Sequence, residues 1–424
     1  MKVLFVAPVE QGSGETITCL HMAESLTAQG HEVHFLASPF AQRLLGEHFP
    51  DRIRRLGDDL QANRRSWEEA VAELRPDVVV FADYPLLFVP TGVAPLADGP
   101  GWQEELESLD ASLVTLDHFG FAQEEMALFL GPPHLSLYYQ RFPAIPERMH
   151  ILLPCPMHEP NPIPGRRGHP FRYWEVPLEL ADAARRQMRS RYLRSEDELL
   201  IFHSVPNWAW RQAAMLGLPF YRYLPAILDH YLRDLPGPVT VVSVNNGSLL
   251  QPPAGSAVRF VNLEPVSKPE FEALLFGSDL VLTENSVSIA MGKAICGLQT
   301  CAALRNSFRF LELLARLESP LKDLVLAMER ERMGTVFPFN VYPAGMTEEL
   351  DRIVLYRDNS LTRAFRALEI FGNGDTRRAL QGLLTDERER EALRDAQREY
   401  VDRLRKLGDC TEVLERVVAE DRAA

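Results

Sequence analysis

The stretch DLVLTENSVSIAMGKAICGL, residues 279–298, decides the fold of this 424-residue chain. A short apolar run, Leu280–Leu282, ends at polar residues, and a segment of small residues with helical spacing follows as far as Gly297. A buried strand that passes through a polar turn into a helix N-terminus is the unit that builds ligand crevices in parallel α/β sheets. The stretch therefore predicts a parallel sheet with a binding crevice at its carboxyl edge.

The first 38 residues have the same design. They give a buried strand at Val3–Ala7, a loop with Gly12 and Gly14, an amphipathic helix over Thr16–Gln29 and a second strand at Glu32–Leu36. Later strands are also continuous apolar runs, which indicates parallel sheets covered by helices on both faces. The expected fold class is therefore α/β, with two Rossmann-like domains that face each other across a cleft.

A segment rich in proline, residues 153–170, is the best candidate for a linker between the two domains. We expect an N-terminal domain over residues 1–165, a C-terminal domain over residues 166–374 and a charged helical tail over residues 375–424. Other expected elements are a helix over Ser66–Leu74 that Ser66 caps, a strand at Leu135–Tyr138 and a last strand at Thr300–Leu304.

The composition is that of a soluble globular enzyme, with 46% hydrophobic and 25% charged residues. The net charge of −14 argues against nucleic acid or an anionic membrane as a partner, because both require a basic surface. No apolar run reaches the roughly 20 residues that span a membrane, and no secretory signal is evident. The five cysteines are scattered in apolar contexts, which is typical of reduced thiols, so we expect a cytoplasmic protein.

Three segments resemble the GT-B fold glycosyltransferases: KVLFVAPVEQGSGETITCLHMAESLTAQGHEVHFLAS (residues 2–38), RSRYLRSEDELLIFHSV (189–205) and VRFVNLEPVSKPEFEALLFGSDLVLTENSVSIAMGKAICGLQTCAAL (258–304). The third is similar to the donor-side block of the lipid-linked N-acetylglucosaminyl transferase of peptidoglycan synthesis and of natural-product glycosyltransferases. The resemblance implies a nucleotide-sugar donor between the domains, a small-molecule acceptor and a role in bacterial secondary metabolism.

The chain departs from this donor-side block at four positions. The glycine of the block falls on Ser286, its threonine on Ile289, its donor-contacting glutamate on Gly292 and its proline on Gln299. If Glu284 were the first of the two glutamates that retaining families use, the second would also fall on Gly292. Another residue then holds the sugar, or the donor is atypical, or donor binding has been lost.

The candidate catalytic residues lie in the N-terminal half. Glu15 stands where the glycine loop of Gly12 and Gly14 meets the first helix, and is a candidate base for the acceptor; alternatively, its charge only stabilises the helix dipole. Asp117 and His118 follow the strand at 113–116, at a carboxyl end where open sheets bind ligands. An aspartate there is placed to orient a histidine base.

The candidate donor-binding residues follow the strands of the second domain. Hydroxyls, amides and helix N-terminal N–H groups at these ends are suited to a diphosphate. The strongest prediction is the turn with Ser286 and Ser288, which alternatively serves only as a helix cap. Together with Gly12 and Gly14, the donor or phosphate candidates are Ser204, Asn207, Glu264, Glu284, Asn285, Ser286, Ser288 and Asn306.

Neither a resident cofactor nor a metal site is expected. Cys155 and His158 have no second pair of ligands, and no Asp-x-Asp motif of metal-dependent transferases occurs. The sequence thus predicts a metal-independent glycosyltransferase, monomeric or homodimeric, with a nucleotide sugar and a small acceptor as partners. Two alternatives stay open: a GT-B-like protein that binds a ligand or partner without transfer, and a sugar-nucleotide epimerase.

Overall fold

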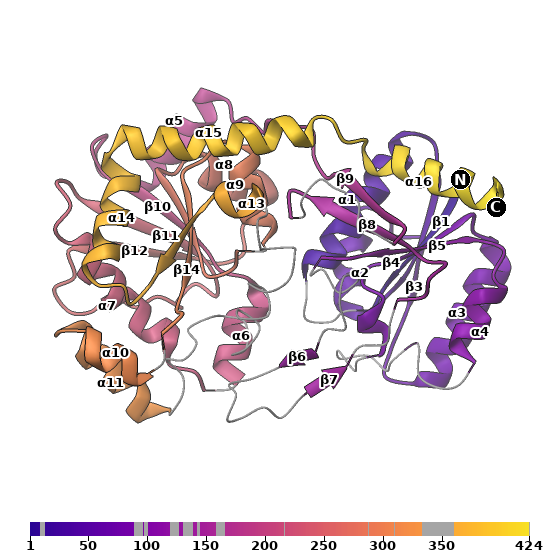
Figure 1. Cartoon of the computed structure of the whole chain (residues 1–424), viewed down its shortest axis with the longest axis horizontal. Helices are drawn as coiled ribbons and strands as arrows, with labels where there is room; N and C mark the ends of the chain where they lie inside the picture. Colours follow the sequence, from indigo (N-terminus) through magenta and orange to yellow (C-terminus); the bar gives the residue numbers. More distant parts are fainter. Residues whose placement is uncertain are drawn as a thin grey trace.

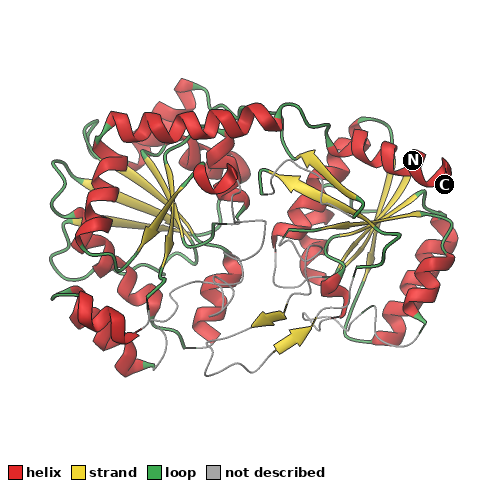
Figure 2. Cartoon of the chain, viewed as in Figure 1, coloured by secondary structure: helices red, strands yellow, loops and turns green. Residues whose placement is uncertain are grey.

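The computed structural model describes residues 1–8, 13–88, 96, 101–118, 127–129, 139–141, 145–157, 166–215, 217–286, 288–308, 310–332 and 360–423. Within these ranges two twisted sheets lie side by side, and each is covered by helices (Figure 1). Figure 2 shows that helices flank both sheets, so that each sheet is the centre of a three-layer α/β unit. The expected fold class is confirmed.

The N-terminal sheet has seven parallel strands in the order β3-β2-β1-β4-β5-β8-β9. These strands are β1 (Lys2–Ala7), β2 (Glu32–Ala37), β3 (Ile53–Arg55), β4 (Val78–Phe81), β5 (Ser112–Leu116), β8 (His150–Cys155) and β9 (Gly168–Arg172). The order reverses between β1 and β4, where Val3 lies opposite Val33 on one side and Val78 on the other. This reversal is the switch point at which open α/β sheets bind ligands.

Alternate residues of β1 enter two different cores. Val3 and Phe5 pack with α1 (Ser13–Ala28) and α2 (Pro39–Gly46), whereas Leu4 and Val6 pack with α3 (Leu60–Leu74) and α4 (Trp102–Ser108). Burial on both faces is the reason why the strand is apolar throughout. The remaining described elements of this half are the 3-10 turn η1 (Pro85–Phe88) and the antiparallel pair β6 (Ala127–Phe129) and β7 (Tyr139–Arg141).

The C-terminal sheet repeats the design with six parallel strands in the order β12-β11-β10-β13-β14-β15, and its switch point lies between β10 and β13. The strands are β10 (Leu199–Ser204), β11 (Val239–Val244), β12 (Val258–Leu263), β13 (Leu280–Thr283), β14 (Cys301–Arg305) and β15 (Arg366–Glu369). The helices around them are α5 (Asp182–Tyr192), α6 (Asn207–Met215), α7 (Phe220–Leu232), α8 (Lys268–Gly277), α9 (Ile289–Cys296), α10 (Phe310–Arg316), α11 (Leu321–Glu331), α13 (Ser360–Arg363) and α14 (Gly374–Thr385).

The last two helices connect the two halves. The long helix α15 (Glu387–Leu404) runs along the C-terminal half, and α16 (Cys410–Ala423) crosses to the N-terminal sheet and packs beside α1 (Figure 1). The hydroxyl of Tyr400 donates to the carbonyl of Pro156, and the backbone N–H of Arg172 donates to the carbonyl of Gly408 at 2.9 Å. The chain therefore ends on the domain in which it began.

Three of the expected elements are wrong. Helix α3 begins at Leu60 and is capped by Asp59, whose carboxylate accepts from the N–H of Ala62, so Ser66 lies inside the helix. β14 is not the last strand, because β15 pairs with it. The proline-rich segment is not a simple linker, since β8 and β9 occupy its two ends.

Proline enters these two strands at positions that tolerate it. Pro154 lies beyond the part of β8 that pairs with β5, and Pro170 lies in β9, at the edge of the sheet. A missing N–H costs little at such positions. The strand expected at Leu135–Tyr138 lies outside the described residues, and the domain boundaries stay predictions. Among the described residues, no helix combines the length and the apolarity needed to cross a membrane.

Candidate functional site

Two helices from different halves, α1 after β1 and α9 after β13, lie on the two sides of one junction between the domains. The ring of His21 on α1 lies 5.3 Å from the ring of Tyr173, and the Tyr173 ring lies 4.5 Å from that of Trp174. The ammonium group of Lys293 on α9 lies 5.7 Å from the centre of the Trp174 ring. This chain of contacts places two crevice-forming helices on the two sides of the same junction.

Glu15 lies in the first turn of α1 with its side chain buried. Its Oε2 finds no hydrogen-bond partner among the described residues. Burial raises the pKa of this carboxyl above its ordinary value of 4.5, because desolvation disfavours the charged form. A carboxyl whose pKa is moved towards neutrality is suited to take up and release a proton.

His118 reaches the same end of α1 from the end of β5. The hydroxyl of Thr18 donates to the carbonyl of Gly14 at 2.9 Å, and it lies 3.0 Å from Nε2 of His118. Since a hydroxyl has one proton to donate, Nε2–H of the neutral ring donates to Thr18, and Nδ1 keeps the lone pair.

Thr18, which the sequence did not single out, therefore contacts His118. The expectation that Asp117 orients His118 stays a prediction; Asp117 lies buried at the end of β5 with its N–H donating to the carbonyl of Leu152. Thr18 lies one helical turn after Glu15. Residues three apart lie on the same face of a helix, so Glu15 and Thr18 are neighbours. The contact of Thr18 with His118 could be inferred only once His118 was known to reach α1.

On the donor side, the turn between β13 and α9 is built from polar groups that order one another. The Ser288 hydroxyl caps α9 by accepting from the N–H of Met291 at 3.0 Å, and the N–H of Asn285 donates to the Thr283 hydroxyl at 3.1 Å. Asn285 is buried and Ser286 half-buried. The turn thus holds the first N–H groups of α9 in place, as anion binding at a helix N-terminus requires.

The other donor candidates lie at neighbouring strand ends. Ser204 ends β10 and is buried. It lies on the same face of the sheet as Phe202, which packs with α9. Asn306 is fully buried and forms a turn with Phe308, and Glu264 packs against Gly247, whose added Cβ would lie 3.3 Å from its side chain. Gly12 and the side chain of Asn207 lie outside the described residues, and an added Cβ at Gly14 would meet no atom within 4 Å.

Glu284 forms a buried hydrogen bond with His203 that the sequence did not reveal. Its Oε1 lies 2.7 Å from Nε2 of His203, and neither side chain has any exposed surface. Nδ1 of His203 lies 3.2 Å from the hydroxyl of Ser243. Alternate residues of a strand lie on the same face of the sheet, so His203 lies on the face of Ile201, which packs against α7. The pair is therefore on the face opposite Ser204 and α9. The contact of Glu284 with a donor stays a prediction.

Gly292 explains why the glutamate of the resembled block is missing. A Cβ at this position would lie 2.8 Å from the Pro156 ring and 3.4 Å from the indole of Trp174. Pro156 directly follows β8 and Trp174 lies just after β9, so both neighbours belong to the N-terminal half. The space of the missing side chain is therefore taken up by the contact between the domains.

We expect Gly292→Ala to destabilise the protein by about 1–3 kcal/mol, the usual cost of inserting a methyl group into a packed contact. Urea unfolding measures this. Gly46→Ala is the matched control, because its added Cβ would meet nothing within 4 Å and alanine favours the helix. Equal stability of Gly292→Ala and the wild type would contradict the packing described here.

Comparison with known proteins gives a family and a fold. The model of the family described as "Family of unknown function (DUF6365)" matches residues 22–423. No curated protein matches the sequence.

Solved structures align over the whole chain. The spinosyn forosaminyltransferase SpnP aligns with a TM-score of 0.56 and 15% identity, covering 99% of both chains. The glycosyltransferase VinC in complex with dTDP aligns at 0.52 and 14%, covering 99% of this chain and 100% of the other. The spinosyn rhamnosyltransferase SpnG, complexed with spinosyn aglycone, aligns at 0.52 and 14%, covering 100% of this chain and 99% of the other. The chain therefore has the GT-B glycosyltransferase fold, as the resemblance implied.

Proposed function

The chain belongs to the DUF6365 family of unknown function, and from this premise we propose that it is a metal-independent glycosyltransferase with a nucleotide-sugar donor and a small-molecule acceptor. The observation that carries the proposal is a pair of chemistries on α1 and α9, the two helices that flank the junction between the halves. A buried carboxyl and a histidine base lie at the start of α1, and the capped start of α9 is suited to an anion. Sugar transfer needs both.

The reaction assigns a task to each side. Glu15 or His118 accepts the proton of the acceptor hydroxyl as its oxygen bonds to the anomeric carbon of the sugar. The bond from that carbon to the diphosphate oxygen breaks, and the nucleoside diphosphate leaves with the bonding electrons. The N–H groups at the start of α9 and the Ser286 hydroxyl stabilise its negative charge, as a metal ion does in other transferases.

Two of the similar structures support the assignment of substrates. VinC is named with a bound nucleoside diphosphate, and SpnG with a bound aglycone, which correspond to the donor product and the acceptor of this proposal. Since SpnP and SpnG are named for spinosyn, we place the acceptor among small natural products of bacterial secondary metabolism, and the enzyme in the cytoplasm.

Thermal unfolding with UDP, TDP, GDP and ADP tests the donor site. One of them should raise the melting temperature, because a ligand at 100 times its Kd adds about 2.7 kcal/mol to the stability of the folded state. Replacing both Ser286 and Ser288 by alanine should abolish the response. Ser267→Ala is the control: it removes the equivalent cap of α8, and should leave the response intact. No response to any of the four nucleotides would refute the donor site.

A second candidate function is ligand binding without transfer. The packing of Gly292 against Pro156 and Trp174 favours it, because the position of the usual donor carboxylate is filled by protein. A protein of this kind would bind a nucleoside diphosphate and leave every nucleotide sugar intact. Donor turnover therefore separates the two functions.

A further inference from the structure

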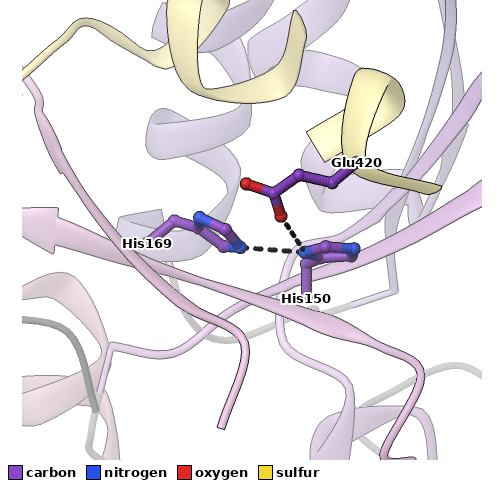
Figure 3. A group of neighbouring side chains, drawn as sticks. All are labelled: His150, His169 and Glu420. Carbon is purple, nitrogen blue, oxygen red and sulfur yellow. Dashed lines mark hydrogen bonds and ion pairs between the residues drawn. The ribbon is translucent and has the colours of Figure 1, made fainter. Parts of the chain in front are cut away.

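Two histidines and a glutamate converge where α16 crosses the edge of the N-terminal sheet (Figure 3). Nδ1 of His150 lies 2.8 Å from Nε2 of His169 and 4.0 Å from Oε2 of Glu420. His150 begins β8 and His169 is the second residue of β9, so both lie at the amino edge of the sheet, opposite the crevice. A site here is independent of the proposed transfer.

A second carboxylate, that of Asp421, contacts the ring nitrogen of His150 that does not face His169. Nε2 of His150 lies 3.0 Å from Oδ1 of Asp421 and 3.1 Å from the guanidinium of Arg167, which lies 2.8 Å from the same Asp421 oxygen. When Nε2–H donates to Asp421, the lone pair of His150 lies on Nδ1 and points at His169. A carboxylate that fixes the outer N–H of a ligating histidine is the usual surrounding of protein-bound zinc.

The charges and burial of the group suit a cation. His150 is fully buried, and His169 is nearly so. Glu420 is half-exposed and its remaining charged neighbour is Arg416, at 3.9 Å, which leaves its carboxylate accessible from solvent.

We propose that Nδ1 of His150, Nε2 of His169 and Oε2 of Glu420 bind a divalent transition-metal ion of the zinc type, which fastens α16 to the N-terminal domain. Two imidazoles and one carboxylate form a known zinc ligand set, with water as the fourth ligand. Zinc–nitrogen bonds of about 2.0–2.1 Å in tetrahedral geometry place the two nitrogens about 3.3 Å apart, so the two nitrogens must separate by about half an ångström on binding. Because α15 packs on the other half, the ion fastens the end of a segment that spans both domains.

No metal site was expected from the sequence, because only ligands close to one another along the chain, such as Cys155 and His158, could be considered as a site. The cluster instead combines residues of two neighbouring strands with a helix at the far end of the chain. Only the return of α16 to the first domain brings them together.

Calorimetric titration of chelator-treated, dialysed full-length protein with zinc chloride tests the site. We expect one equivalent to bind and the melting temperature to rise with zinc. Glu420→Gln and His169→Gln should each weaken binding at least tenfold, and Asp421→Asn by about 10–100-fold, as for other outer-shell carboxylates. Since Glu420 is half-exposed, its variant should fold even if His169→Gln does not.

Glu415→Gln is the matched control, because it removes a different histidine–glutamate contact, 3.5 Å to His31, between the same helix and the same domain. It should bind zinc as the wild type does. If the wild type takes up no zinc, or if Glu420→Gln and His169→Gln bind it with wild-type affinity, the residues form only a hydrogen-bonded pair of histidines beside a surface glutamate, and the proposal is overturned.

Discussion

Glu15→Gln should lower the rate of sugar transfer by about 10²–10⁴-fold and at the same time make the protein more stable at neutral pH. Glutamine has nearly the same shape but cannot take the acceptor proton. It also carries no ionisable group, so the cost of a buried carboxyl disappears. A substitution that lowers activity and raises stability indicates that the original residue serves the reaction rather than the packing of the protein.

The stability gain should depend on pH in a defined direction. Burial raises the pKa of Glu15 in the folded state above its ordinary value of 4.5. Below pH 4.5 the carboxyl is protonated in both states, and the variant and the wild type should differ little. As the pH rises further, the unfolded chain releases the proton while the folded protein keeps it, so the wild type loses stability until the folded pKa is passed.

Melting temperatures of both proteins between pH 4 and pH 8 measure this difference. Glu47→Gln, at the exposed end of α2, is the control and should show neither the loss of activity nor the growing stability gain. A Glu15→Gln protein that transfers sugar at the wild-type rate, or that melts below the wild type at neutral pH, would show that Glu15 serves the helix and not the reaction.

Glu284→Ala should lower the free energy of unfolding by about 1–3 kcal/mol, the cost of leaving a buried hydrogen-bonding group without its partner. The pair with His203 is fully buried, so the remaining imidazole cannot replace its partner with water. Glu284→Gln should cost less, because the amide oxygen can still accept from Nε2 of His203. Urea unfolding compares the two variants.

Removal of an exposed pair gives the control. Arg378→Ala breaks an ion pair with Asp375 in which both side chains are about three-quarters exposed, and should change stability little. A loss below about 1 kcal/mol for Glu284→Ala would contradict the buried pair. If Glu284→Gln instead folds normally and loses the response to nucleoside diphosphates, Glu284 acts on the donor, as expected from its place after β13.

The fold was predictable because its decisive signals are local. The strand at Leu280–Thr283 and the helix that ends at Cys296 follow from a continuous apolar run, a polar turn and a glycine. Long-range pairings were not predictable. β15 joins β14 across more than sixty residues, and α16 returns to the first domain, and neither leaves a local trace in the sequence.

The site was predictable in outline for a geometric reason. Carboxyl ends of parallel strands share one edge, so polar residues after β5, β10 and β13 were expected to gather at the crevice. The face of the sheet on which each side chain lies was harder to predict, because neighbours such as His203 and Ser204 point to opposite faces. Gly292 shows a third limit: its meaning depends on Pro156, which is distant in sequence and lies against it in space.

Turnover of the donor shows whether the chain transfers a sugar. Nucleotide sugars that carry the base found by thermal shift are incubated with the protein and with a panel of hydroxyl acceptors or water alone, and free nucleoside diphosphate is quantified by chromatography. We expect the wild type to release nucleoside diphosphate and Glu15→Gln to release at least a hundredfold less, as for loss of a general base. Bound nucleoside diphosphate together with intact sugar donor in every reaction would contradict it, and would identify the chain as a binding protein.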